Sequence, residues 1–268
     1  MIESTNTDVG RSRWLRSWGY HAEYYAQTWR GSVASSVLFP ILYLAALGVG
    51  VGHLVSHHTG LLPDGQTYLH FIAPSLLATT TMQLGEGESL WPVLACVKWI
   101  RTYHAAATTP LDPDDILFGK LAWVATRAFL TSVLYTIIIA CFGAIQSWWC
   151  LTLPFIGTLV TLAFSAPLVA YAARSQSDAS FTTLYRFAFV PMFLFSATFY
   201  PLSAYPGYLR PVVQFFPLYH GVALARSAAF GQGSIVPELG HIAVLVAMTV
   251  IGVAWGRRTM RRRLTDRC

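Results

Sequence analysis

Long apolar stretches alternate with short polar ones along most of the 268-residue chain. A membrane-spanning helix needs about 20 apolar residues, because the bilayer core has no water to pair with exposed peptide groups. Five stretches meet this requirement directly, and a sixth, 181–202, is apolar in spite of Arg186, Pro191 and Pro201. The pattern predicts an all-α polytopic membrane protein with six transmembrane helices, at about 33–55, 68–94, 116–144, 150–173, 181–202 and 236–256.

The composition is that of a membrane protein. Hydrophobic residues make up 54% of the chain and charged residues 11%, whereas a soluble domain carries about 25% charged residues. The basic residues gather in the two tails and at the ends of the apolar stretches rather than among stacking aromatics, so no nucleic-acid partner is expected. Cytoplasmic loops carry the excess of Lys and Arg, so both termini are predicted to be cytoplasmic.

The first 30 residues predict a cytoplasmic tail and an amphipathic helix on the membrane surface. At 100° per residue, Trp18, Tyr25 and Trp29 share an apolar face, and Arg13 and Arg16 lie on the opposite side. Such a helix lies among the lipid headgroups with its rings in the apolar boundary. The alternative is a helix packed on a separate soluble domain, which the sequence does not show. Three regions are therefore expected: 1–30, a six-span transmembrane domain at 31–258, and a basic cytoplasmic tail at 259–268.

The segment 203–234 differs from an ordinary outer loop. Its apolar pieces of about eight and twelve residues are separated by Pro206, Pro211, Pro217 and Gly221. Pieces of this length are too short to span a bilayer, but they can dip into it when protein covers their ends. We expect an outer re-entrant helical pair between spans five and six, with a flexible extracellular loop as the alternative.

The sequence contains few residue patterns typical of catalytic or metal-binding sites. The pair Gly119-Lys120 lacks the flanking residues of a phosphate-binding loop, so no nucleotide is expected on this chain. The cluster of His53, His57 and His58 at the outer end of span one is interpreted as polar loop residues rather than a metal site. The four cysteines have no metal-ligand spacing. The sequence thus predicts no catalytic residue, no metal and no cofactor.

Charged residues at membrane depth stand out more. Glu86 and Glu88 follow the apolar part of span two, either inside the membrane or in the headgroup region. An ionised carboxylate at depth needs a cavity, a cation or a partner helix. Lys120 and Arg127, seven residues apart, share a face of span three, which suggests an interhelical Glu88–Arg127 pair. A rival interpretation, an intramembrane lipid-modifying enzyme, would use Glu86, Glu88 and His104.

The loop between spans two and three combines a short helical run with prolines and acidic residues. Pro110 and Pro113 end the run, and Asp112 or Asp114 suits the N-terminal cap of the next helix. This predicts a short rigid helix at the cytoplasmic surface. It is either a simple turn or a lever for a cytosolic partner.

These features together resemble the membrane subunit of ABC type-2 exporters, and among them the nodulation-type (NodJ-like) and drug-exporter permeases. The resemblance rests on ordered blocks that run from about residue 11 to the basic tail: FPILYLAALGVGVG, YLHFIAPSLLATT with Glu88 downstream, RTYHAAATTPLDPDDILFGKLAW, and PMFLFSATFYPLSAYPGYLRPVVQFFPLYHGVALAR. His104 and the alanines after it depart from the pattern, because an acidic residue is more usual there.

The resemblance implies a permease in a prokaryotic plasma (inner) membrane that exports an amphipathic molecule: a lipid-linked saccharide, a glycolipid or a hydrophobic drug. It implies two ABC ATPase subunits that carry ATP and Mg, and a second permease chain in a homodimer or heterodimer. The coupling helix to the ATPase would comprise Arg101, Thr102, Tyr103, His104, Ala105, Ala106, Ala107, Thr108 and Thr109. Candidates for the substrate path are Thr79, Thr80, Gln83, Glu86, Glu88, Phe193 and Phe195.

Overall fold

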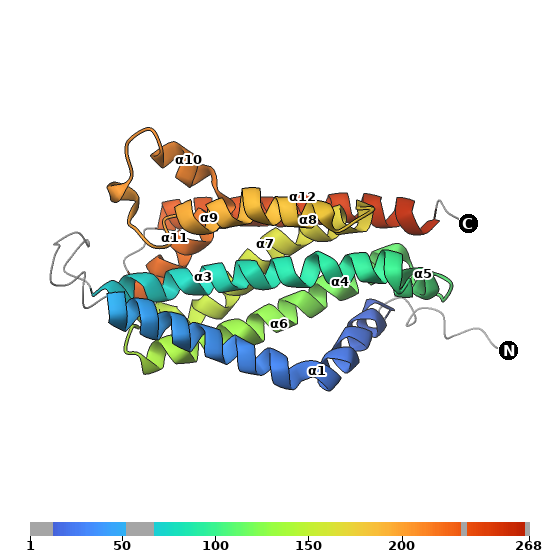
Figure 1. Cartoon of the computed structure of the whole chain (residues 1–268), viewed down its shortest axis with the longest axis horizontal. Coiled ribbons are helices and arrows are strands. Elements are labelled where there is room, and N and C mark those ends of the chain that lie inside the picture. Colours follow the sequence, from blue (N-terminus) through green and yellow to red (C-terminus); the bar gives the residue numbers. More distant parts are fainter. Residues whose placement is uncertain (1–12, 52–66, 232–234, 266–268) are drawn as a thin grey trace.

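The computed structural model describes residues 13–51, 67–231 and 235–265, and within these ranges all regular structure is helical. The expected all-α class is therefore confirmed. The long helices lie side by side along the long axis of the molecule (Figure 1): α1 (Arg13–Tyr43), α3 (Tyr68–Ser89), α6 (Pro113–Cys141), α7 (Leu153–Arg174) and α12 (Ile235–Thr265). The histidines His53, His57 and His58 lie outside the described residues.

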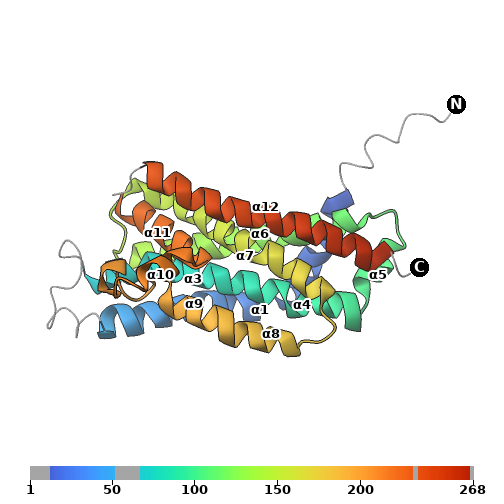
Figure 2. The same ribbon diagram turned by 90° about the horizontal axis from the view of Figure 1, so that it is seen from above.

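Among the described residues, three helical segments are long and apolar enough to cross a bilayer: Pro113–Cys141, Trp148–Arg174 and Val236–Leu264. Three further elements run parallel to them. The first is α1 with the π-helical turn Leu44–Val51 that continues it, and the second is α3 with α4 (Trp91–Leu94), which follows it. The third is α8 (Ala179–Leu184), joined through Tyr185–Phe189 to α9 (Val190–Phe195), on the side of the molecule opposite α12 (Figure 2). Six spans remain the prediction.

Helix α7 forms the centre of the bundle. Its most apolar segment is 67% buried inside the protein, whereas that of α12 is only 17% buried. Two of its hydroxyls bond to α3, because Thr161 Oγ1 donates to the Thr81 carbonyl at 2.9 Å and Ser165 Oγ to that of Gly85 at 3.3 Å. The core of the bundle is therefore built around α7, and α12 exposes most of its surface.

Short helices occupy the two ends of the bundle. At one end, the π-helical turn Ala95–Trp99 leads to α5 (Thr102–Ala107), close to the start of α1 and the end of α12 (Figure 1). At the other end lie the 3-10 turns Trp148–Thr152 and Leu202–Ala204 and the helices α10 (Arg210–Phe215) and α11 (Pro217–Phe230). The expected outer helical pair matches α10 and α11 in position, and its re-entrant placement stays a prediction.

One half-buried arginine fixes the α11 end of the bundle. The guanidinium of Arg226 lies 3.7 Å from the centre of the Phe71 ring and donates to the Phe71 carbonyl at 3.3 Å. It also donates to the carbonyls of Ala197 (2.6 Å) and Thr198 (3.0 Å), just after α9 ends. Helix termini leave carbonyls without partners, and Arg226 supplies donors for two of them. The side chain therefore ties α11 to α3 and to the end of α9.

The close approach of α12 to α7 depends on Gly252. A methyl group there would lie 2.5 Å from Pro167 Cδ, whereas a methyl group at Gly240 of the same helix meets no atom within 4 Å. We predict that Gly252→Ala lowers the free energy of unfolding by about 1–3 kcal/mol, the usual cost of overpacking. Thermal unfolding in detergent measures it. Gly240→Ala, the matched control, should be neutral or slightly stabilising, and equal stability of the two variants would contradict the packing.

Candidate functional site

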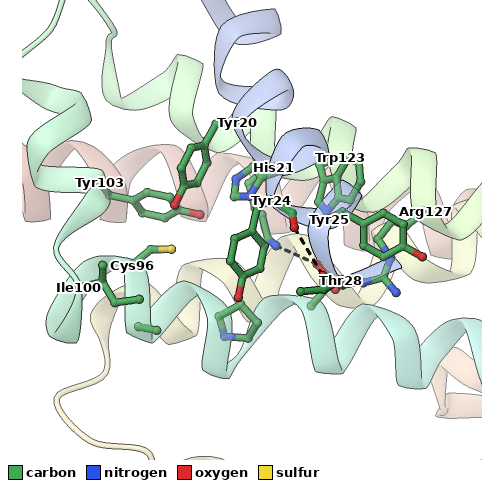
Figure 3. Close-up of a pocket in the computed structure, with 14 residues that line it drawn as sticks. Tyr20, His21, Tyr24, Tyr25, Thr28, Cys96, Ile100, Tyr103, Trp123 and Arg127 are labelled. Atoms are coloured by element: carbon green, nitrogen blue, oxygen red, sulfur yellow. Dashed lines mark hydrogen bonds and ion pairs between the residues drawn. The ribbon is translucent and has the colours of Figure 1, made fainter. Parts of the chain in front are cut away.

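A buried cluster of three charges joins α3 to α6 near the α5 end of the bundle (Figure 3). Glu88 Oε2 accepts a hydrogen bond from Lys120 Nζ at 3.0 Å, and Glu88 Oε1 accepts one from Arg127 Nη1. Side-chain exposure is 15% for Glu88, 3% for Lys120 and 14% for Arg127. Charges this deeply buried are stable only when paired. We call these residues the charge triad.

Helix α1 covers the triad on its outer side. The ring of Tyr25 lies 4.7 Å from the Arg127 guanidinium, and the Tyr25 and Trp18 rings contact the Trp123 ring at centroid distances of 5.4 and 6.3 Å. The indole N–H of Trp18 donates to Thr126 Oγ1 at 3.2 Å. The N-terminal part of α1 therefore packs on α6 along this face.

This packing changes the expected picture of the surface helix. The sequence placed Trp18, Tyr25 and Trp29 together in the lipid boundary, but Trp18 and Tyr25 are half-buried against α6 and only Trp29 is exposed. Arg16 is exposed, as expected for the polar face, whereas Arg13 lies 3.8 Å from an Asp112 carboxylate oxygen. The angular pattern identified an apolar face and could not say whether lipid or protein covers it.

A pocket of about 330 Å³ opens beside the triad, between α1, the end of α3, α4 and α6. Its wall is rich in tyrosine, and it includes all three members of the triad and His21 (Figure 3). His21 is 8% exposed, and its Nε2 has no hydrogen-bond partner among the described residues. Burial, and next the positive charge of Lys120, lower the pKa of His21 to about 4, so the ring is neutral at physiological pH.

The predicted coupling segment Arg101–Thr109 forms a helix over a shorter range, Thr102–Ala107. Arg101 precedes it in a left-handed conformation (φ 60°), and the hydroxyls of Thr108 and Thr109 bond to carbonyls in its last turn. Tyr103 is buried and reaches the pocket wall. The remaining side chains are small or partly exposed: Thr102, His104, Ala105, Ala106 and Ala107. Helix α5 therefore has a buried aromatic anchor and an accessible outer face.

The start of α6 is braced from two sides. Asp112 and Asp115 form a reciprocal capping box, which holds the end of the turn that follows α5. Asp114 accepts hydrogen bonds from Arg257 and Arg261 near the end of α12, at 2.6–3.0 Å. Both arginines are largely exposed. The joint between α5 and α6 is thus linked to the end of α12.

The candidate substrate-path residues divide among three environments. Thr79 is buried and donates to the Ser75 carbonyl, and Glu86 is 5% exposed. Gln83 and Phe195 are exposed, and Thr80 and Phe193 are half-buried. Glu88 belongs to the triad and lines the pocket. The structure therefore does not bring this set together within one chain. The pocket wall includes neither Glu86 nor His104, so the residues named for the lipid-modifying alternative are not gathered there either.

Three residues that line the pocket, His21, Tyr20 and Tyr24, were not singled out as site residues from the sequence. Tyr103 was predicted as part of the coupling helix and Asp114 as a possible helix cap, but their contacts with the pocket and with two arginines were not predicted. Lys120 was placed on the same helix face as Arg127, but only Arg127 was predicted to pair with Glu88. The seven-residue spacing is a signal from which the pairing of Lys120 with the same carboxylate could have been predicted. The pocket itself depends on the approach of α1 to α6, for which the sequence gives no distance.

Comparison with known proteins identifies the family. Residues 21–230 match the sequence profile of the ABC-2 type transporter family. The chain belongs to the ABC-2 type transporters. This permease is 28% identical over 258 residues to nodulation protein J of Rhizobium leguminosarum bv. viciae, covering 96% of each chain, and 27% identical to nodulation protein J of Rhizobium meliloti, over 94% of each.

A second kind of relative also matches. A protein of Mycobacterium tuberculosis named a probable doxorubicin resistance ABC transporter permease, DrrC, is 23% identical over 237 residues, covering 82% of this chain and 78% of that protein. The resemblance to exporter permeases is therefore confirmed, and the chain is a multi-pass membrane subunit of an ABC transporter.

The triad gives a prediction about the permease's stability. Glu88→Gln leaves two buried cations without a counter-charge, so we expect a loss of about 3–5 kcal/mol in the free energy of unfolding. Arg127→Met should cost less, because Lys120 keeps its pair with Glu88. Adding Arg127→Met to Glu88→Gln should recover part of the loss, a non-additivity expected of contacting residues.

Thermal or denaturant unfolding of the purified variants in detergent measures these differences. Arg16→Gln, at an exposed position of α1, is the control and should be close to neutral. If Glu88→Gln is no more destabilising than Arg127→Met, the carboxylate does not hold both cations.

Proposed function

We propose that the chain is the permease of an ATP-driven exporter that moves an amphipathic molecule outward across the plasma membrane of a prokaryote. The observation that carries the proposal is α5: a short helix at one end of the bundle, anchored by buried Tyr103 and exposing small side chains to the outside. An accessible rigid helix of this kind suits docking of a separate motor subunit.

In this proposal ATP is bound and hydrolysed on another chain. Two ABC ATPase subunits bind ATP and Mg, and each docks on the α5 of one permease in a pair of permease chains, identical or different. Both tails and α5 face the cytoplasm, in keeping with the arginines at the end of α12 and the positive-inside rule. The six spans include the three apolar helices together with α1, α3 and α8–α9.

Movement of α5 would reach the bundle through α6. The capping box joins the turn after α5 to the first turn of α6, and the triad joins α6 to α3. Helix α1 is attached to α6 by Trp18, Tyr25 and Arg127. A push on α5 therefore shifts α6, α3 and α1 together as a body. The direction of transport follows from the substrate's different affinities for the inward and outward states.

The substrate is proposed to be part apolar and part polar, as in lipid-linked saccharides, glycolipids and hydrophobic drugs. Two features support this. Gln83 and Thr80 lie on the more exposed side of α3, and exposed or half-buried aromatics such as Phe195 and Phe193 lie on α9. One relative is named for doxorubicin resistance, and doxorubicin is a hydrophobic drug. We propose that these surfaces meet the substrate between two permease chains, beneath the outer pair α10 and α11.

The direct test is co-expression with an ABC ATPase subunit of the same organism, followed by ATPase measurement in proteoliposomes across a lipid and drug panel. We expect a stable complex whose ATP hydrolysis rises at least twofold with an amphipathic compound. Ala105→Glu, on the exposed face of α5, should abolish at least nine-tenths of that stimulation, because a charged bulky side chain blocks docking. Membrane insertion should be unchanged.

Ala26→Glu is the matched control, because Ala26 is also an exposed alanine near this end of the bundle but lies on α1. It should keep the stimulated rate. Full stimulation in Ala105→Glu would remove α5 as the docking element, and turnover of nucleotide or lipid by the purified chain alone would overturn the proposed function.

A further inference from the structure

Lys120 has more hydrogen-bond donors than the protein satisfies. An ammonium group carries three N–H donors, and across the described residues the side chain donates once, to Glu88 Oε2. The side chain is only 3% exposed, so it has little contact with the protein's outer surface. A buried donor without a partner costs about 1–3 kcal/mol, and more when it is charged. Lys120 lines the pocket, which is where acceptors can approach it.

His21 adds a second unsatisfied polar atom in the same wall. Its ring is 92% buried, and no described residue partners Nε2. His21 comes from α1 and Lys120 from α6, so two helices contribute unsatisfied polar groups to one cavity. Figure 3 shows His21 next to Tyr20 and Tyr24, and the same pocket wall includes Tyr25 and the triad.

The charges of the wall do not cancel. Lys120 and Arg127 carry two positive charges and Glu88 one negative charge, which leaves one net positive charge beside a cavity of about 330 Å³. Apart from His21 and Thr28, the rest of the wall is aromatic or apolar and includes four tyrosines and Trp123. A cavity of this size, mainly apolar with a few convergent polar groups, is typical of a small-molecule site.

We infer that this pocket binds the headgroup of an anionic amphiphile, with its phosphate or carboxylate oxygens at Lys120 and His21 and its less polar part against the tyrosines. In the proposed topology the pocket lies at the cytoplasmic surface, behind the surface part of α1. The same chemistry is offered by an anionic membrane lipid and by an anionic amphiphile awaiting export. The inference goes beyond the proposed function, since binding requires neither the ATPase nor transport.

The test is equilibrium binding of radiolabelled dodecyl phosphate to the full chain in phosphatidylcholine nanodiscs. We expect saturable binding of one probe per chain, with inorganic phosphate binding at least tenfold more weakly because it leaves the aromatic wall unfilled. Phosphatidylglycerol should compete and phosphatidylcholine should not. Tighter binding of phosphatidylglycerol than of the single-chain probe assigns the pocket to a resident lipid, and the reverse order assigns it to an exported amphiphile. Either order supports the site, and failure of both dodecyl phosphate and phosphatidylglycerol to bind overturns it.

The two lysines of the chain provide a matched pair of variants. Lys120→Met should lower affinity for dodecyl phosphate at least tenfold, because a charge-assisted hydrogen bond is lost. Lys98→Met should leave it unchanged, since Lys98 is exposed, bonds to the Gln176 carbonyl and lies outside the pocket wall. Equal affinity of the two variants would overturn the assignment.

A second pair avoids the triad, so that loss of the fold cannot imitate loss of the site. Thr28 lines the pocket, whereas Ala26 on the same exposed stretch of α1 does not. Thr28→Trp should obstruct the pocket and weaken binding at least fivefold, while Ala26→Trp should bind as the unmodified chain does. Undiminished binding by Thr28→Trp would place the probe elsewhere. These results are independent of the ATPase assay, so failure of the site and failure of the proposed export function are distinguishable.

Discussion

The bundle depends on neutralising charge where water does not reach. Glu88 is the residue on which this rests, because its two carboxylate oxygens receive Lys120 from one direction and Arg127 from another. The cations lie about two turns apart on α6, so one carboxylate on α3 serves both only in one relative position of the two helices. A slip of one helical turn, about 5.4 Å, would leave a cation unpaired. The triad therefore sets the register of α3 against α6, while apolar packing alone would allow several.

At the α11 end of the bundle, a second charge shielded from water is stabilised without an acidic partner. The guanidinium of Arg226 is satisfied by three peptide carbonyls and the face of Phe71. Two of those carbonyls follow the end of α9, where Ala197 adopts a left-handed conformation (φ 58°). The carbonyls after α9 lack donors and the Arg226 guanidinium lacks acceptors, so each satisfies the other's hydrogen-bonding groups. A charge pair at one end and a cation on carbonyls at the other hold α3 at both of its ends.

The sequence predicts the features that depend on local pattern. Apolar length predicted the spanning class. The seven-residue spacing of Lys120 and Arg127 placed both on one helix face, and a pair between Glu88 and Arg127 was predicted from it. Features that depend on the distance between helices could not be predicted from the sequence. Periodicity gives the angular position of Trp18 but not the neighbour that covers it, so its ring was assigned to lipid although it packs on α6. The pocket arises from that same approach. Boundaries also shifted, because the left-handed Arg101 starts α5 one residue later than the helical run suggested.

Burial also determines which ion pairs of this permease are costly to break. The pairs around the start of α6 involve exposed arginines, Arg257 and Arg261, and the Arg13–Asp112 contact is longer and more exposed still. Exposed pairs contribute about 0–1 kcal/mol each and weaken with salt. Breaking the buried triad costs several kcal/mol. In the proposed mechanism, a displacement of α5 is therefore expected to exchange the exposed pairs before it separates Glu88 from its cations. Bending is then expected at the α5–α6 joint and at the end of α12, while α3, α6 and the covering part of α1 move together.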